Sequence, residues 1–289
     1  MADDAGTTAA SALHEAEARF ENGAIEAPRV QAMALLAHAL GTNRAGVLAR
    51  LGDPLVDRDA ELFEQLVARR LANEPLQYLL GRAHFLDFSV RVGPGVFIPR
   101  PETEQLVETA LHTWDPRYRW AIDLCCGSGA IAVALARARP RARILAIDRA
   151  VAPRRMALRN IRDHRVEGRV TVCAADLLTG LAAGRARAHL GAIICNPPYA
   201  ASGEVVQPEI VDYEPRLAWE AGPAGTEAYA RLIPQSAELL ASGRPLLLEL
   251  GYEQADAVRR LLADDGRWVE VTIDDDFQGI PRVLTARRR

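Results

Sequence analysis

Two patterns of hydrophobic and polar residues divide the chain. As far as about residue 71, apolar residues recur at helical spacing, and Gly23, Gly41 and the Gly52-Asp53-Pro54 segment interrupt them. The interruptions separate three amphipathic segments, so we expect a small helical bundle over residues 1–75. The apolar faces consist of Leu13, Ala16 and Phe20 in the first segment, of Val30, Met33, Ala34, Ala37 and Leu40 in the second, and of Leu62, Leu66 and Val67 in the third.

From about residue 120 onward, short continuous apolar runs alternate with segments of helical periodicity. Such runs are typical of strands buried on both faces of a parallel sheet, and their alternation with helices predicts a Rossmann-like, doubly wound α/β fold. The last two runs have no helix between them. We therefore expect an antiparallel edge pair in a mostly parallel seven-stranded sheet within residues 101–289. The expected strands are 120–124, 144–147, 170–173, 191–195, 246–250, 268–273 and 282–286.

Residues 76–100 link these two regions. Apolar and polar residues alternate over 85–92, and Gly93-Pro94-Gly95 precedes a second apolar stretch at 96–98. We expect a β-hairpin here, with its turn at the glycines and the proline. Residues 200–225 lack periodicity and are expected to form a long loop beside a substrate site. The last three arginines, 287–289, are expected to form a solvated tail.

The expected fourth strand ends at Asn196-Pro197-Pro198-Tyr199. Two successive prolines lack the N–H donors of a central strand, so the chain leaves the sheet here, at the carboxyl edge where open α/β sheets bind ligands. The Asn196 side chain and the Pro197 carbonyl are two acceptors for the N–H bonds of one –NH2 group. They would stabilise the charge that develops as its nitrogen attacks an electrophile, and Tyr199 adds an aromatic face. A proline-rich turn capped by Asn196 is the alternative.

A strand, a glycine turn and a helix over residues 120–138 form the arrangement typical of nucleotide-binding sites. The next strand ends in Asp148, where a carboxylate can accept hydrogen bonds from ribose hydroxyls. Asp148 could instead cap the following helix. Because the turn and Asp148 occur together, we favour the ribose role. Asp176 follows the third strand, and its carboxylate could accept from an adenine amino group or belong to a plain turn.

Composition limits the class of protein. The net charge is −3, and residues 1–75 carry 12 acidic residues against 7 arginines, which is unlike a protein that holds nucleic acid by phosphate contacts. The four cysteines form no C-x-x-C pair, which argues against a zinc site and a disulfide framework. The acidic start lacks an apolar signal segment, and no run approaches a membrane span, so we expect a cytoplasmic protein.

In this order, the glycine turn, the two aspartates and the Asn-Pro-Pro-Tyr motif resemble the class I S-adenosylmethionine-dependent methyltransferases that modify planar nitrogens. More narrowly, the chain resembles the peptide chain release factor glutamine methyltransferases of the PrmC/HemK type over most of residues 75–286. The segments that carry this resemblance are Pro75-Leu76-Gln77-Tyr78 with Gly81, Ile98-Pro99-Arg100-Pro101-Glu102-Thr103-Glu104, Asp123 with Gly127-Ser128-Gly129, Asn196-Pro197-Pro198-Tyr199, Tyr213-Glu214-Pro215, Glu249-Leu250-Gly251-Tyr252-Glu253-Gln254, and Arg282-Val283.

The resemblance implies methyl transfer from S-adenosyl-L-methionine, with S-adenosyl-L-homocysteine as product and no metal, to the side-chain amide nitrogen (N5) of the glutamine in the Gly-Gly-Gln motif of class I release factors. The release factor would be a protein partner recognised by the helical bundle, with no nucleic acid or membrane contact, and the chain would act as a monomer. The residues implied to bind the cofactor are Asp123, Cys125, Gly127, Gly129, Asp148, Asp176, Asn196, Arg100 and Thr103. Those implied in substrate binding or catalysis are Asn196, Pro197, Pro198 and Tyr199.

The chain departs from the family's pattern at Ile161, where relatives tend to have alanine after the asparagine, and more notably at Cys125. Cys125 stands where the family has the first glycine of its turn, and a positive φ would be costly there. We expect instead that this position accepts a small side chain. Two other functions remain open: methylation of an exocyclic base amine in DNA or RNA, against which the acidic helical region argues, and a non-catalytic scaffold that binds S-adenosylmethionine.

Overall fold

The computed structural model describes residues 7–181, 184 and 186–289, and these form two compact units. The first unit extends to Arg82 and also takes in Gln207–Tyr213, whereas the second comprises Ala83–Val206 and Glu214–Arg289. The linker expected over residues 76–100 is therefore shared between the two units. The acidic start of the chain, from which we expect no signal peptide, lies outside the described residues.

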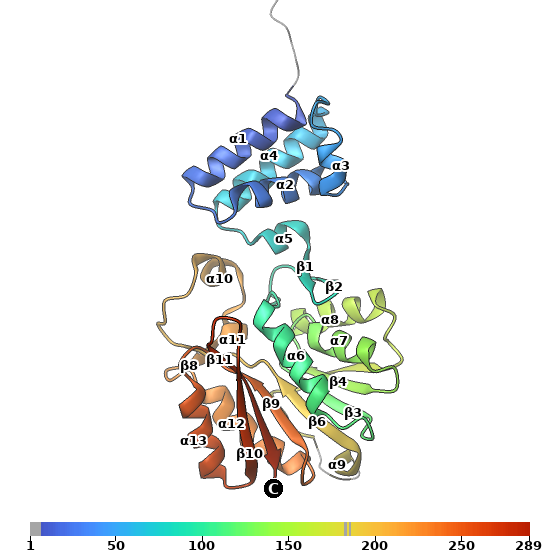
Figure 1. Ribbon diagram of the computed structural model, residues 1–289, viewed down its shortest axis with the longest axis vertical. Coiled ribbons are helices and arrows are strands. Elements are labelled where there is room, and N and C mark those ends of the chain that lie inside the picture. Colours follow the sequence, from blue (N-terminus) through green and yellow to red (C-terminus); the bar gives the residue numbers. More distant parts are fainter. Residues whose placement is uncertain (1–6, 182–183, 185) are drawn as a thin grey trace, which may run out of the picture. The chain divides into compact units, whose positions relative to one another are not determined.

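The first unit is helical (Figure 1). Phe20, Leu35, Leu36 and Phe63 are fully buried in its core. Its three longer helices agree with the expected bundle. Two short helices of 5 residues each are additional, because so short a segment shows little periodicity. The helices are α1 (Ala9–Asn22), α2 (Pro28–Ala39), α3 (Arg44–Leu48), α4 (Asp57–Leu71) and α5 (Leu76–Leu80).

A segment from far along the chain, α10 (Pro208–Tyr213), belongs to the first unit as well. Arg70, whose side chain is 3% exposed, donates hydrogen bonds to the Glu209 carboxylate and to Gln31 Oε1. Tyr213 Oη donates to the carbonyl of Ala72 at 2.7 Å. These bonds fasten α10 to the end of α4.

The hairpin turns at a different place from the one expected. β1 (Arg82–Phe85) and β2 (Phe88–Arg91) form a two-stranded sheet, so the hairpin turn lies at Leu86 and Asp87 and not, as predicted, at Gly93-Pro94-Gly95. A turn does occur at Gly93-Pro94-Gly95, where the Val96 N–H donates to the Gly93 carbonyl at 3.1 Å, but residues 96–98 beyond it are not a strand. Leu86 has φ +53°, and its N–H donates to Glu104 Oε1 at 2.9 Å. A side chain from the following helix thus supports a turn that contains neither glycine nor asparagine.

The second unit is built on the expected seven-stranded sheet. The strand order is β10-β11-β9-β6-β3-β4-β5, and the pairs among β5, β4, β3, β6 and β9 are parallel. β11 pairs antiparallel with both β9 and β10, so it lies between them and β10 forms the edge. The strands are β3 (Trp120–Leu124), β4 (Arg143–Asp148), β5 (Val170–Ala174), β6 (Leu190–Cys195), β9 (Pro245–Glu249), β10 (Trp268–Asp275) and β11 (Pro281–Arg288).

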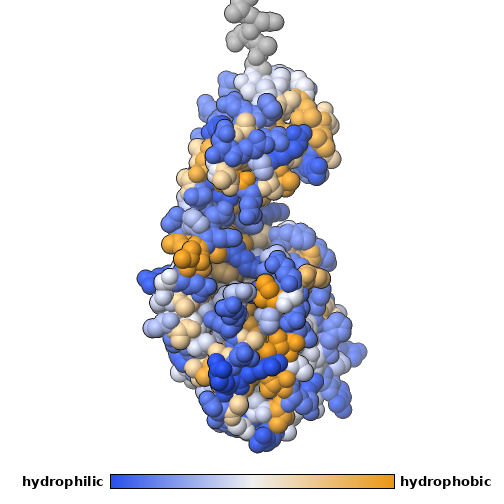
Figure 2. Space-filling model, turned by 60° about the vertical axis from the view of Figure 1, so that its left-hand side comes forward, coloured by the Kyte–Doolittle hydropathy of each residue, from blue (hydrophilic) through white to orange (hydrophobic). Residues whose placement is uncertain are grey.

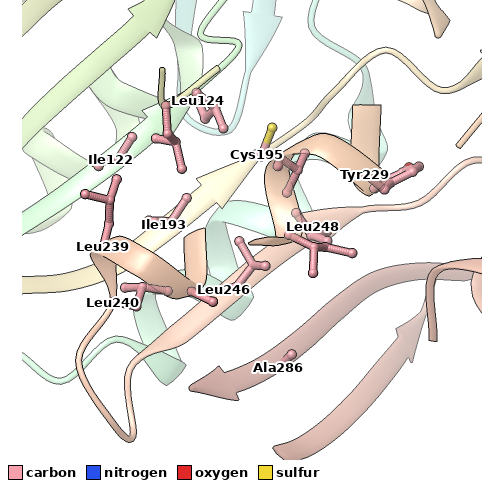
Figure 3. Packing of buried hydrophobic residues seen from close by; sticks show 14 of the residues in the cluster. Ile122, Leu124, Ile193, Cys195, Tyr229, Leu239, Leu240, Leu246, Leu248 and Ala286 are labelled. Carbon is pink, nitrogen blue, oxygen red and sulfur yellow. The ribbon is translucent and has the colours of Figure 1, made fainter. Parts of the chain in front are cut away.

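Helices cover both faces of this sheet. Ile122 and Leu124 of β3 belong to the cluster that includes Tyr229 and Leu239 of α12 (Figure 3), whereas Asp123 between them accepts a hydrogen bond from Ala132 of α7. Because successive strand residues point to opposite faces, α12 and α7 lie on opposite sides of the sheet. The helices of this unit are α6 (Pro101–Thr113), α7 (Ala130–Ala138), α8 (Val151–Asp163), α9 (Ala186–His189), α11 (Arg216–Trp219), α12 (Glu227–Leu239) and α13 (Ala255–Asp265).

Two segments expected to be irregular have structure. Residues 200–225 contain α10 and α11 together with the short parallel pair β7 (Ala200–Ala201) and β8 (Glu220–Gly222). The final arginines are not a tail, because β11 continues to Arg288, Arg287 donates to the Gly243 carbonyl, and Arg288 donates to the Ala237 carbonyl. Long aliphatic stems let arginines lie along a sheet edge, which a charge pattern does not reveal.

The surface is mixed in character. Hydrophilic residues predominate on the face seen in Figure 2, and smaller hydrophobic patches interrupt them. Among the described residues, no helix has both the length and the apolar character needed to cross a membrane.

Candidate functional site

The Asn-Pro-Pro-Tyr motif leaves the sheet at the carboxyl end of β6, where the sequence places it. β6 is buried along its whole length and ends at Cys195. Beyond it, the N–H of Tyr199 donates to the Trp219 carbonyl at 3.1 Å, and Gln254 Nε2 donates to the Tyr199 carbonyl at 2.7 Å. The main chain at Tyr199 is thus held from two sides, while the Asn196 side chain is partly accessible.

The Asn196 side chain is bonded to residues far away in the sequence. Its Nδ2 donates to Thr103 Oγ1 at 3.0 Å, and Thr103 Oγ1 donates to Glu249 Oε2 at 2.7 Å. Thr103 and Glu249 are buried. This contact occupies the amide nitrogen of Asn196 and leaves its carbonyl oxygen as the acceptor available for a ligand.

Sequence reasoning assigned no site role to Glu249. Burial raises the pKa of this carboxyl to about 7, and the hydrogen bond from Thr103 opposes the rise. Burial also raises the pKa of the nearby Tyr199 phenol, and the charge of Glu249 adds to the effect. Tyr199 is therefore a neutral wall of the site and no base. The signal that could have found Glu249 is a carboxylate directly after three leucines at the end of a buried strand.

The glycine turn between β3 and α7 contains three residues with positive φ. Cys125 has φ +60°, so this cysteine does adopt the conformation for which the family uses glycine. Gly127 has φ +54° and open space where a Cβ would stand, whereas a Cβ on Gly129 would lie 3.0 Å from the Cβ of Ala157. The turn is therefore open to a ligand at Gly127, and Gly129 allows α7 to pack closely on α8.

Asp123 lies beneath this turn with no exposed surface. Its Oδ2 accepts the N–H of Ala132 at 3.0 Å. Burial raises the pKa of Asp123 to about 8, and the bond from Ala132 opposes the rise. In this position Asp123 supports the start of α7, and any effect on a cofactor would pass through the turn.

The buried Asp123 makes the stability of the fold depend on pH. Its pKa is raised from the ordinary 3.8 to about 8, so between these values the folded chain binds a proton that the unfolded chain has lost. This contribution is complete below the ordinary pKa and is lost as the pH rises to about 8. Urea midpoints measured from pH 5 to 9 should fall with pH in the wild type and less steeply in Asp123→Asn. Equal slopes in the two proteins would contradict the assignment.

Asp148, at the end of β4, makes two contacts of different kinds. Its Oδ2 accepts the N–H of Gly127 at 3.1 Å, and its Oδ1 accepts the N–H of Ala150, the N-cap of α8, at 2.9 Å. The bond to Ala150 closes a local turn two residues on, and α8 has no side-chain capping hydrogen bond, so the capping role considered as an alternative is not observed. Neither contact excludes the ribose role. Each carboxylate oxygen has a second lone pair, and the bond to Gly127 brings Asp148 to the open part of the turn.

Asp176 lies just beyond β5, and 47% of its side chain is exposed. Its carboxylate accepts a hydrogen bond from Arg231 at 2.5 Å, and Arg149 lies 4.0 Å away. The two arginines compete with an adenine amino group for this carboxylate.

Arg100, which is partly exposed, forms an ion pair with the buried Glu214 inside the second unit. The Arg100 guanidinium donates to Glu214 Oε1, and the N–H of Ile98 donates to Glu214 Oε2 at 3.0 Å. The guanidinium also lies 4.8 Å from the centroid of the Phe97 ring. Arg100 and Thr103, both expected to bind cofactor, thus serve first to hold the segments Tyr213-Glu214-Pro215 and Asn196-Pro197-Pro198-Tyr199.

No group of three or more histidine, cysteine, aspartate or glutamate side chains that could hold a metal ion occurs within the described ranges. The groups that this edge presents are the Asn196 oxygen, the main-chain carbonyls, the Tyr199 ring and the open turn at Gly127.

Two family models match the chain. Residues 11–81 match the PrmC N-terminal domain, and residues 90–213 match the methyltransferase small domain. A release factor glutamine methyltransferase of Moorella thermoacetica is 39% identical over 98% of this chain and 99% of its own length. A protein of the same name from Mycolicibacterium smegmatis is 36% identical over 96% of this chain and 97% of its own.

Solved structures resemble the fold at lower identity. The hMettl16 catalytic domain, in complex with an RNA hairpin, has a TM-score of 0.55 at 19% identity and covers 77% of this chain and 81% of that one. The 16S rRNA N2 G1207 methyltransferase of Thermus thermophilus, in complex with AdoMet and guanosine, has a TM-score of 0.51 at 20% identity and covers 72% and 50%. At such identity they show a shared Rossmann-like methyltransferase fold and nothing about the substrate.

Proposed function

The chain belongs to the release factor glutamine methyltransferase family, and from this membership we propose that it methylates the side-chain amide nitrogen of the glutamine in the Gly-Gly-Gln motif of class I release factors. The full-length relatives favour this function over methylation of a nucleic acid base. The observation that carries the proposal within the site is the Asn196 carboxamide, whose nitrogen is bonded to Thr103 and whose oxygen is therefore left to accept.

The residues at the β3–α7 turn fit S-adenosyl-L-methionine as the methyl donor. Gly127 leaves the main chain open to a ligand, and Asp148 beside it has free lone pairs for the ribose hydroxyls. Asp176 would accept from the adenine amino group, in competition with Arg231. When bound, this donor supplies an electrophilic methyl group on a positively charged sulfonium and becomes S-adenosyl-L-homocysteine.

The residues of the motif would hold and orient the glutamine. An amide nitrogen is a poor nucleophile because its lone pair is delocalised. The Asn196 oxygen and the Pro197 carbonyl accept its two N–H bonds and stabilise the positive charge that develops on it. The Tyr199 ring would lie beside the glutamine as an aromatic face. The nitrogen would form its bond to the methyl carbon as the carbon–sulfur bond breaks and the sulfur leaves as a neutral thioether. No base is needed before the attack, because the nitrogen becomes acidic only as it is methylated, and its proton then passes to water. The chain's contribution is therefore positioning together with correctly placed acceptors.

The helical unit is proposed to recognise the release factor. Acidic residues outnumber arginines in residues 1–75, so a protein surface suits this unit better than a phosphate backbone. A substrate that belongs to the translation machinery places the enzyme in the cytoplasm.

Labelled methyl transfer tests the function directly. The protein is incubated with methyl-labelled S-adenosyl-L-methionine and a recombinant class I release factor, and a parallel sample carries alanine in place of the Gly-Gly-Gln glutamine. We expect label in the first sample and none in the second. Equal labelling of the two samples, or labelling of naked nucleic acid instead, would contradict the proposal.

A further inference from the structure

Three side chains from separate elements form one chain of hydrogen bonds behind the substrate motif. It runs from Asn196 Nδ2 to Thr103 Oγ1 at 3.0 Å and from Thr103 Oγ1 to Glu249 Oε2 at 2.7 Å. Thr103 lies in the first turn of α6, while Asn196 and Glu249 stand at the ends of neighbouring strands, because Cys195 of β6 is the register partner of Leu248 of β9. The fold itself brings these three residues together.

The direction of this chain follows from the protons available. A threonine hydroxyl has one hydrogen, and Thr103 gives it to Glu249 Oε2, which accepts it whether the carboxyl is ionised or carries its proton on the other oxygen. Towards Asn196, Thr103 can then only accept. The opposite orientation of the carboxamide would place two oxygens with no hydrogen between them in contact, so Oδ1 is turned away from Thr103.

The Thr103 hydroxyl and the Glu249 carboxyl are buried, which restricts their movement and costs free energy of folding. Thr103 is 3% exposed and Glu249 is 1% exposed, so the Thr103 hydroxyl and the Glu249 carboxyl have little access to water as an alternative partner. A buried carboxyl also costs free energy that another leucine at the end of β9 would not. The bond from Thr103, which in turn accepts from Asn196, gives this buried carboxyl a role behind the motif.

We propose that Glu249 and Thr103 are positioning residues, which hold the Asn196 carboxamide with its oxygen directed at the amide to be methylated. This inference rests on the proposed function, in which that oxygen accepts an N–H bond of the glutamine. A carboxamide free to rotate would present its own N–H bonds to the substrate for part of the time. If the oxygen is already held in place before the substrate binds, the reaction does not have to supply the free energy needed to orient the carboxamide.

Two substitutions of Thr103 test the proposal. Thr103→Val removes both bonds with little change of shape, whereas Thr103→Ser keeps the hydroxyl. We expect Thr103→Val to lower kcat by about 10- to 30-fold and to change the Kd for S-adenosyl-L-methionine by less than about twofold. Thr103→Ser should recover most of the loss. Wild-type kcat in Thr103→Val, or equally slow turnover in both variants, would overturn the proposal.

Thr285 offers a control for the loss of a buried hydroxyl by itself, because its Oγ1 has no hydrogen-bond partner among the described residues. It is a buried threonine of the same unit, on β11, and it takes no part in the site. Thr285→Val should leave kcat unchanged, while its Tm shows what the loss of a buried hydroxyl does to the fold. If Thr285→Val lowered kcat as much as Thr103→Val does, the effect would be one of stability and the proposal would fail.

Glu249→Gln tests whether Glu249 acts through Thr103. In the Thr103→Val background, Glu249→Gln should lower kcat little further, because the connection to Asn196 is already broken. If the double variant lost kcat by the product of the two separate losses, Glu249 would act independently of Thr103, which would contradict the proposal.

A measurement without release factor separates this inference from the proposed function. Hydrogen exchange of the Asn196 side-chain NH2 group, identified by NMR through its loss in Asn196→Ala, should be slow in the wild type and in Thr103→Ser and fast in Thr103→Val. This pattern in a protein that methylates no class I release factor would refute the function and leave the positioning role standing. Fast exchange in the wild type would overturn the positioning role.

Discussion

Replacing Asn196 by alanine is expected to lower kcat for release factor methylation by about 100- to 1,000-fold, since it removes an acceptor aimed at the charge that develops on the nitrogen. The Pro197 carbonyl remains, so the amide would be held by one acceptor and free to turn. Single-turnover assays with saturating S-adenosyl-L-methionine give the rate of the methyl transfer itself. Calorimetry on the same variant should show an unchanged affinity for the donor.

This pair of measurements separates substrate holding from cofactor binding. A variant that keeps turnover within about tenfold of the wild type would remove Asn196 from the substrate-holding role. A large loss of donor affinity would instead make it a cofactor ligand. Pro197 cannot be tested in the same way, because its contribution comes from the main chain.

Asp148→Ala is expected to act on the other half of the site and to weaken S-adenosyl-L-methionine binding by about 10- to 100-fold, the usual effect of losing hydrogen bonds to a charged group. At saturating donor, kcat should change much less. Titration calorimetry in the absence of release factor measures the affinity directly.

Asp148 also accepts the N–H groups of Gly127 and Ala150, so lost affinity alone could reflect a distorted turn. An analogue of S-adenosyl-L-homocysteine that lacks the ribose 2′-hydroxyl distinguishes the two causes. The wild type should bind this analogue more weakly than S-adenosyl-L-homocysteine, whereas Asp148→Ala should bind both alike. If the variant still discriminates between them, the ribose contact lies elsewhere.

Much of the second unit could be predicted from sequence for a specific reason. Strands covered on both faces appear as continuous apolar runs, so β3 was found at its observed bounds and β6 within one residue. Pro197 and Pro198, which follow soon after Cys195, also show from the sequence where the strand ends at the carboxyl edge of the sheet. Because helices connect these parallel strands, their carboxyl ends meet at one edge of the sheet, and the site residues that follow the strands are expected there.

The features that could not be predicted from the sequence depend on contacts between residues that are far apart in the chain. The turn at Leu86 and Asp87 has a leucine at its positive-φ position and is supported by Glu104, whose carboxylate accepts the Leu86 N–H. Likewise, the importance of Glu249 appears only when the first turn of α6 is placed over the end of β9, where Thr103 meets it. Local periodicity carries no information about such pairs.

The path of the chain through α10 has a practical consequence for exchanging parts between relatives. The chain leaves the second unit after Val206 and returns to it at Glu214, so seven residues from the middle of the methyltransferase sequence belong to the helical unit. A chimera that replaced only the first 82 residues would separate Arg70 and Ala72 from Glu209 and Tyr213, their partners on α10. Exchanging the helical unit of this enzyme for that of a relative therefore requires two segments to be replaced, and the two segments are expected to have changed together during evolution.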